Sequence, residues 1–125
     1  MKVKFGVLVL ALMVLLAGCL PAGAAPKAKA RAKLPTLKML STTTCPACDM
    51  MEPVLEELKT RYKGKVATEH IYLEDHPDVA RKYKVRYVPT LIFSDARGKE
   101  FAKKIGYKPL EEIIAIFAKG GVRLW

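Results

Sequence analysis

The sequence predicts one α/β domain with the element order β-α-β-α-β-β-α, in which helices cover both faces of a four-stranded mixed sheet. Short segments rich in β-branched and apolar residues alternate with segments whose apolar residues recur every three or four positions. The chain has 125 residues and is 51% hydrophobic, which suits a single domain and argues against a multidomain enzyme or a disordered chain.

The first half of the domain is expected to hold two strands joined by a helix. Residues 36–43 and 66–73 are extended and apolar, as strands are. Residues 46–62 between them form the helix, with Pro53 as an internal kink and Gly64 as its stop. The side chains expected to face the core from this helix are Met51, Val54, Leu55, Leu58 and Tyr62.

The second half is expected to begin with a short helix over residues 77–83. A strand at 90–93 and a strand at 99–105 follow, joined by a turn into a hairpin. Residues 109–119 form the last helix, which Gly120 ends. Its inward side chains are expected to be Leu110, Ile113, Ile114 and Phe117.

The net charge of +10 suggests an anionic partner, but the charge is unevenly spread. Residues 1–33 carry six Lys and Arg and no Asp or Glu, which leaves 16 basic against 12 acidic residues, or +4, for the remainder. A domain at +4 is only mildly basic, so no nucleic-acid partner is expected.

The N-terminus is typical of an export signal. Two lysines precede an apolar run over residues 5–17, which is shorter than a membrane span requires. The Leu-Ala-Gly-Cys motif that follows resembles a bacterial lipobox, which implies cleavage of a signal peptide at 1–18 and a lipid anchor on Cys19. Cleavage before Ala25, giving a soluble secreted or periplasmic protein, and an uncleaved anchor are the alternatives. All three place the domain outside the cytoplasm, where disulfides persist.

Residues 19–35 are rich in Ala, Pro and Lys, and are expected to form a disordered tether between Cys19 and a folded domain at 36–125. Its four basic side chains either attract anionic lipid or simply keep the tether soluble.

The remaining cysteines form a Cys45-Pro46-Ala47-Cys48 motif at the junction of a predicted strand and helix. A helix N-terminus stabilises a thiolate, which makes it a nucleophile. Cys45, before the first turn, is expected to be the more exposed and to attack a substrate disulfide, and Cys48 to resolve the mixed disulfide. A Cys45–Cys48 disulfide would oxidise a substrate dithiol by the reverse route.

The motif alone also fits part of a zinc site, with His70 and His76 as further ligands. It also fits a purely structural disulfide, but a four-residue loop constrains the unfolded chain little, so such a disulfide would stabilise the fold only weakly.

The wider pattern resembles the thioredoxin superfamily over residues 36–120. Residues 45–58 look like its active-site helix, 85–91 like its segment around a cis-proline, and 104–106 like its late strand-end glycine. The resemblance implies a thioredoxin-like fold with a cis Val88–Pro89 bond and no cofactor. It also implies a substrate-binding lip; the residues that we assign to it are Thr44, Pro46, Val88 and Pro89.

This chain departs from the family's pattern near the dithiol. Thr44 replaces the usual Trp, and Met39 replaces a buried Asp that would accept the proton of the resolving thiol. Glu69 and His70 are therefore candidates for a proton relay, or else a solvated pair on what is expected to be an edge strand.

The sequence as a whole predicts a monomeric thiol–disulfide oxidoreductase anchored at the cell envelope, with a slight preference for the reductase direction. Its expected partners are protein thiols or disulfides and an electron-transfer protein in the membrane. The alternatives are an envelope copper-handling protein that uses the same two thiols, because Cu(I) favours soft ligands, and a binding module with a vestigial site.

Overall fold

The computed structural model describes residues 33–125, which form the predicted α/β domain. The elements are β1 (Thr36–Ser41), α2 (Pro46–Arg61), β2 (Ala67–Tyr72), α3 (Pro77–Lys82), β3 (Thr90–Ser94), β4 (Glu100–Ile105) and α4 (Leu110–Lys119). The predicted order is confirmed, with small shifts at the element ends. The signal peptide, Cys19 and most of the tether lie outside the described residues. None of the helices within 33–125 combines the length and the apolar character that a membrane span requires.

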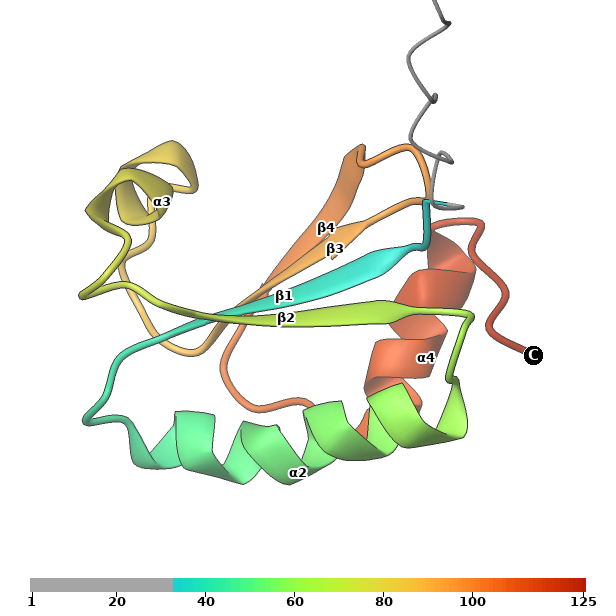
Figure 1. Cartoon of the computed structure of the whole chain (residues 1–125), viewed down its shortest axis with the longest axis horizontal. Coiled ribbons are helices and arrows are strands. Elements are labelled where there is room, and N and C mark those ends of the chain that lie inside the picture. Colours follow the sequence, from blue (N-terminus) through green and yellow to red (C-terminus); the bar gives the residue numbers. More distant parts are fainter. Residues whose placement is uncertain (1–32) are drawn as a thin grey trace, which may run out of the picture. The chain divides into compact units, whose positions relative to one another are not determined.

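The sheet has the strand order β2-β1-β3-β4 (Figure 1). β1 pairs with β2 in parallel and with β3 antiparallel, and β3 pairs antiparallel with β4, so the sheet is mixed as predicted. β2 is an edge strand, which the sequence also predicted. β1 and β3 lie in the centre, and all five residues of β3 are buried, which fits its continuous apolar sequence.

Helices α2 and α4 pack on one face of the sheet and enclose the hydrophobic core (Figure 1). At its centre, Phe93 of β3 meets Phe117 of α4 edge to face, with ring centroids 5.1 Å apart. The core face of α2 is the predicted one. That of α4 is also the predicted one, with Ile116 buried in addition and Ile114, like Val54 of α2, partly buried against the core.

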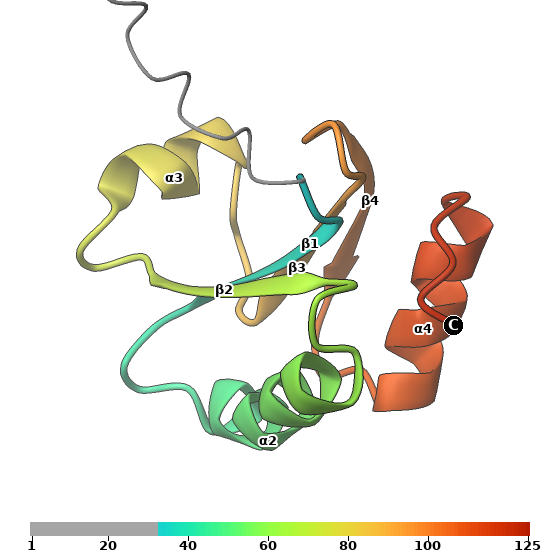
Figure 2. The same cartoon turned by 45° about the vertical axis from the view of Figure 1, so that its right-hand side comes forward.

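The opposite face of the sheet is covered differently. Helix α3 lies on that side (Figure 2), but none of its own residues is buried, although Leu40 and Ile92 beneath are fully enclosed. The segment is attached through Tyr83, whose carbonyl oxygen accepts a hydrogen bond from the Lys103 ammonium group on β4. Burial, followed by a hydrogen bond to Glu100, raises the pKa of the Tyr83 hydroxyl to about 12. The second helical layer, α3, therefore buries none of its own residues and is attached to the sheet through Tyr83 at its C-terminal end.

Candidate active site

The two cysteines of the motif are joined by a disulfide at the start of α2, with their Cα atoms 5.2 Å apart. Cys45 is the N-cap residue in an extended conformation, and Pro46 follows at the first helical position, where its missing N–H costs no hydrogen bond. Cys45 keeps 7% of its surface exposed and Cys48 only 2%. Cys45 is therefore the more exposed residue of the pair, although both are buried.

Backbone N–H groups of the first helical turn are directed at Cys45. The N–H of Cys48 donates to the Cys45 Sγ at 3.2 Å and to the Cys45 carbonyl oxygen at 3.0 Å. The N–H of Asp49 reaches the same carbonyl oxygen at 3.1 Å. These donors, with the positive end of the helix dipole, stabilise negative charge on the Cys45 sulfur once the disulfide is reduced. This arrangement suits a thiolate nucleophile and leaving group.

The Val88–Pro89 peptide bond is cis, as the resemblance implied. It ends the loop after α3, directly before β3, where Thr90 is paired with Leu40 of β1. The hydroxyl of Thr90 donates to the carbonyl oxygen of Tyr87 at 2.6 Å, and the Pro89 carbonyl oxygen accepts from the N–H of Gly106 at 2.8 Å. The loop is thus fixed between β1 and the end of β4. Pro89 itself is buried.

The other residues of the predicted lip differ in exposure. Val88 is half-buried, and Thr44 and Pro46, which flank Cys45, are exposed. Thr44 stands in the short connection from β1 to α2, and Val88 stands in the cis-proline loop. The two halves of the lip therefore come from different parts of the chain.

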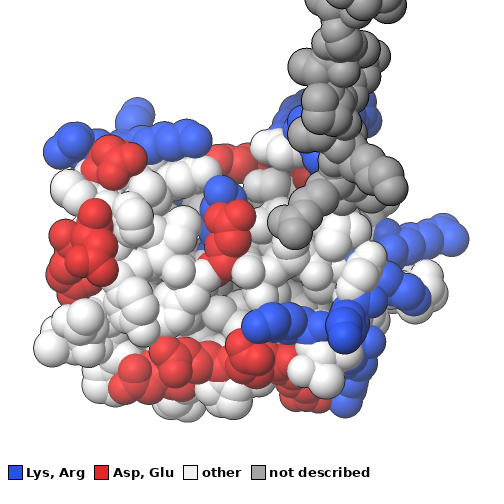
Figure 3. All heavy atoms as spheres, in the orientation of Figure 1, with Lys and Arg blue, Asp and Glu red and all other residues white. Residues whose placement is uncertain are grey.

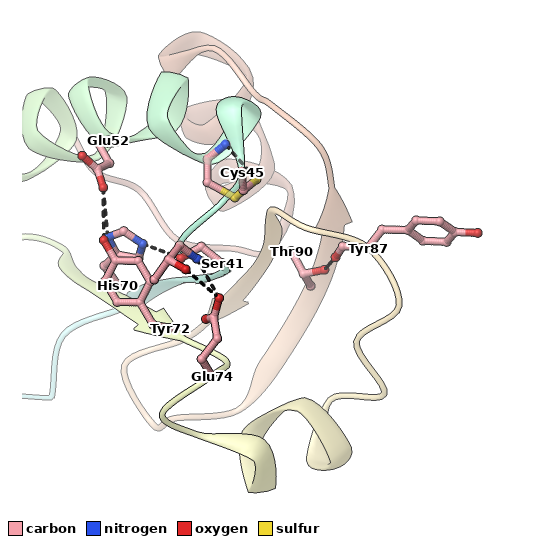
Figure 4. The surroundings of a disulfide bond; sticks show 10 residues. Ser41, Cys45, Glu52, His70, Tyr72, Glu74, Tyr87 and Thr90 are labelled. Atoms are coloured by element: carbon pink, nitrogen blue, oxygen red, sulfur yellow. Dashed lines mark hydrogen bonds and ion pairs between the residues drawn. A yellow bond between two sulfur atoms is a disulfide. The ribbon is translucent and has the colours of Figure 1, made fainter.

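A polar network lies next to the disulfide, at the edge of the sheet (Figure 4). The Ser41 hydroxyl, which is fully buried, is 2.6 Å from Nε2 of His70. Nδ1 of the same ring is 3.6 Å from Oε1 of Glu52 on α2. The imidazole thus lies between a hydroxyl at the end of β1 and a carboxylate on the active-site helix. Sequence reasoning named His70 but missed Ser41 and Glu52.

Tyr72 completes this network. Its ring packs against that of His70, with centroids 4.4 Å apart, and its hydroxyl donates to Glu52 Oε1 at 3.5 Å. Desolvation, and then the negative charge of Glu52, raise the pKa of the Tyr72 hydroxyl, which keeps it a neutral donor. Tyr72 therefore holds the Glu52 carboxylate beside the imidazole.

Glu69, the other candidate for the proton relay, lies on the opposite side of β2. Successive strand residues point to opposite faces of a sheet, so Glu69 cannot share the α2 side with His70. Its carboxylate instead pairs with Lys38 of β1 at 3.0 Å. Met39, which stands where the family has its buried Asp, is fully buried. The structure brings His70, but not Glu69, toward the dithiol side.

The connection from β1 to Cys45 is held by a carboxylate. Glu74 Oε1 accepts hydrogen bonds from the backbone N–H of Thr43 at 2.8 Å and from its hydroxyl at 3.1 Å. The backbone hydrogen bond from Thr43 is the largest cause that lowers the pKa of Glu74 below its usual 4.5. No local sequence pattern indicates this contact, because the two residues are 31 positions apart.

Replacing Glu74 by glutamine is expected to flatten the acid limb of the stability curve. A carboxylate whose pKa is lowered in the folded state stabilises the fold above its unfolded pKa, and this contribution is lost as the pH falls through the folded value. Urea unfolding between about pH 6 and pH 3 should show the gap between wild type and Glu74→Gln narrowing toward acid. A gap that stays constant with pH would contradict the assigned hydrogen bonds.

The described residues around the dithiol do not form a metal site. Within residues 33–125, no group of three or more His, Cys, Asp or Glu side chains is placed to hold a metal ion. The sulfurs of Cys45 and Cys48 are bonded to each other. The arrangement instead matches reversible disulfide exchange through Cys45.

Comparison with known proteins agrees with this chemistry. The thioredoxin family model matches residues 28–119. Thioredoxins of Staphylococcus aureus strains Mu50 and MW2 are each 38% identical over 78 residues, which is 62% of this chain and 73% of theirs. A solved structure titled as thioredoxin-2, a component of the malaria parasite protein secretion machinery, superimposes with a TM-score of 0.64 at 22% identity and covers 69% of this chain and 82% of its own. The chain belongs to the thioredoxin family and is a thiol–disulfide oxidoreductase.

Proposed function

We propose that this oxidoreductase acts on protein disulfides at the bacterial cell envelope, with Cys45 as the nucleophile and Cys48 as the resolving thiol. The observation that carries the proposal is the position of Cys45 at the N-terminus of α2, where it is the more exposed of the two cysteines and its sulfur accepts the N–H of Cys48. Thr44, Pro46, Val88 and Pro89 form the lip that receives the substrate.

The reaction balances without a cofactor. The Cys45 thiolate attacks one sulfur of the substrate disulfide, forms a mixed disulfide and releases the other substrate sulfur as a thiolate. Cys48 then loses its proton and attacks the Cys45 sulfur. The Cys45–Cys48 bond forms, the bond to the substrate breaks, and two electrons have passed from the protein to the substrate. The opposite sequence oxidises a substrate dithiol.

The proton of Cys48 must pass to a base, and we infer that His70 receives it by way of Ser41. The Ser41 hydroxyl is buried and bonded to the imidazole. A hydroxyl both accepts and donates a proton, so it can relay one to Nε2 of His70. Glu52 faces the other ring nitrogen and stabilises the imidazolium that results.

The cellular location rests on the N-terminal segment. A lipobox-like motif that ends at Cys19, and a basic tether behind it, support a lipoprotein whose domain faces the periplasm or the outside of the cell. Mass spectrometry of the mature protein tests this directly: we expect a lipid-modified Cys19 at the N-terminus. A mature protein that begins with unmodified Ala25 would show a soluble secreted form instead.

The direction of exchange is proposed to be reductive, with electrons supplied by a membrane protein. The compact domain and its anchor resemble envelope reductases, whereas Pro46 and Val88 are similar to residues of envelope oxidants. Equilibration of the Cys45–Cys48 pair with glutathione buffers, read by mass after thiol trapping, gives its reduction potential. We expect a value near that of thioredoxin, about −270 mV; one near −120 mV would reverse the assignment.

A further inference from the structure

The edge strand β2 has backbone groups without a partner strand. Among the described residues, β2 pairs with β1 alone. The N–H groups of Ala67 and Leu73 both donate toward β1, at 2.8 and 2.9 Å. Because backbone groups alternate in direction along a strand, the N–H groups of Thr68, His70 and Tyr72 point away from β1. We call this side of the strand the free edge of β2; such an edge can pair with a further strand.

The side chains of the same three residues share the α2 side of the sheet, since every second residue of a strand faces the same way. His70 and Tyr72 both reach Glu52 of α2 there (Figure 4). A hollow of about 370 Å³ opens between the helix and the strand, and is lined by Glu52, Leu55, Glu56, Lys59, Thr68 and His70. A strand added at the free edge would direct every second side chain toward this hollow.

The surroundings of the free edge are acidic. Residues 41–58 and residues 66–78 contain eight Asp and Glu and no Lys or Arg. Asp49, Glu52 and Glu56 are exposed and, at spacings of three and four, form one stripe along α2. Figure 3 shows acidic side chains along most of α2 at the lower edge, with basic ones where the helix ends. An occupant of this edge therefore meets mainly carboxylates.

Nearby basic side chains do not neutralise this stripe. Lys59 pairs with Glu56 at 3.6 Å, but the two side chains are 63% and 70% exposed, so the pair is weak. Within residues 33–125, the ionisable partner of Glu52 is the His70 ring at 3.6 Å rather than a Lys or Arg. A second copy of the chain would bring another acidic α2 to the same edge. Charge therefore favours a basic occupant over a second copy.

We propose that the free edge of β2 binds an extended segment of another polypeptide, in which Lys or Arg alternates with uncharged residues. The backbone of the segment bonds to that of Thr68 and His70, and its cations lie over Glu52 and Glu56. β1 lies between this edge and β3, which follows the cis-proline loop, so the substrate lip stays free. The inference goes beyond the proposed function, which needs only the dithiol and its lip.

Labelled peptides of about ten residues, long enough to cover the six residues of β2, test the proposal. One alternates lysine with threonine, and the other holds the same residues as a block of lysines followed by threonines. Fluorescence anisotropy with the oxidised full chain, in neutral detergent micelles at low ionic strength, measures binding. We expect the alternating peptide to bind at least about tenfold more tightly. Equal affinities would overturn the proposal.

Backbone methylation separates strand pairing from charge attraction. Methyl groups on the N–H of either the lysines or the threonines remove the donors from one edge of the extended peptide and leave the other edge intact. One of the two methylated peptides should lose affinity by about tenfold or more, and the other should keep it. The peptide that loses affinity gives the direction of the added strand. Equal affinities of the two would contradict strand pairing and overturn the proposal.

Charge removal assigns the binding to a surface. Glu52→Gln/Glu56→Gln is expected to weaken binding of the alternating peptide about tenfold. Glu111→Gln/Glu112→Gln removes the same charge from α4 and should change the affinity by less than about twofold. The same weakening by both double variants would show that only net charge matters, and the free edge would then not be the site.

The binding measurement does not depend on turnover, because it uses the disulfide form. Cys45→Ser, which removes the nucleophile, should bind the alternating peptide as wild type does. A wild-type chain that binds the peptide but reduces no protein disulfide would contradict the proposed function alone. One that reduces disulfides but binds neither peptide would contradict this inference alone. If light scattering also showed that chain to be a dimer, a second copy would be the occupant of the edge.

Discussion

Cys45→Ser is expected to lower the turnover of a protein disulfide by about a thousandfold or more, because a serine hydroxyl neither attacks a disulfide nor leaves as a thiolate would. Insulin reduction with dithiothreitol as the electron source measures this loss. The substitution changes one atom at the N-cap, and serine is a favourable N-cap residue, so α2 should still form. Unchanged turnover in Cys45→Ser would remove the basis of the assignment.

Cys48→Ala is the matched variant for the second step. It leaves the nucleophile in place but removes the thiol that resolves the mixed disulfide. A covalent complex between Cys45 and the substrate should therefore accumulate and be visible on a non-reducing gel. If the complex instead accumulated in a Cys45→Ala variant, the roles of nucleophile and resolving thiol would be exchanged.

Most of the fold could be predicted because each element carries its own periodicity. The stripe through α2 predicted its buried face, and the continuous apolar run of β3 fits a strand buried on both sides. The prediction for α4 was less exact. Ile113, Ile114 and Ile116 are all apolar, so the pattern did not show which of them is buried. Ile113 and Ile116 are, on the same helix as Phe117, whose ring packs against Phe93 and Phe101.

The site could be predicted where a short motif or the family resemblance marks its residues. The Cys45–Cys48 pair follows from one motif, and the cis bond before Pro89 follows from a resemblance. The contact between Ser41 and His70 spans 29 positions and depends on the parallel pairing of β1 with β2. No local pattern marks a single serine at a strand end as the partner of a distant histidine.

His70→Gln is expected to slow the resolving step by about a hundredfold and to leave the first attack nearly unchanged. Glutamine retains hydrogen-bonding capacity toward Ser41 but does not take up a proton. The two steps can be followed separately with an aromatic disulfide that is added in an amount equal to the protein and whose thiolate is coloured when it is released. Attack by Cys45 releases one coloured thiolate, and attack by Cys48 on the resulting mixed disulfide releases the second.

The split between the two releases distinguishes a base from a merely structural residue. Glu52 and Tyr72 face the imidazole, and Glu56 and Lys59 line the same hollow between α2 and β2. Loss of a proton acceptor slows only the step in which Cys48 loses its proton, which is the second release. A structural loss would slow the first release as well.

Three variants at Glu69 and Ser41 are the matched controls for His70→Gln. Glu69→Gln removes the neighbouring acid, which pairs with Lys38 on the other face of the sheet, and should leave both releases unchanged. Ser41→Ala should slow the second release as His70→Gln does, and Ser41→Thr, which keeps the hydroxyl, should restore it. If Glu69→Gln slowed the second release as much as His70→Gln does, both losses would reflect a disturbed strand β2. The proton of Cys48 would then not pass to His70 through Ser41. The base replacing the absent aspartate would then have to be solvent.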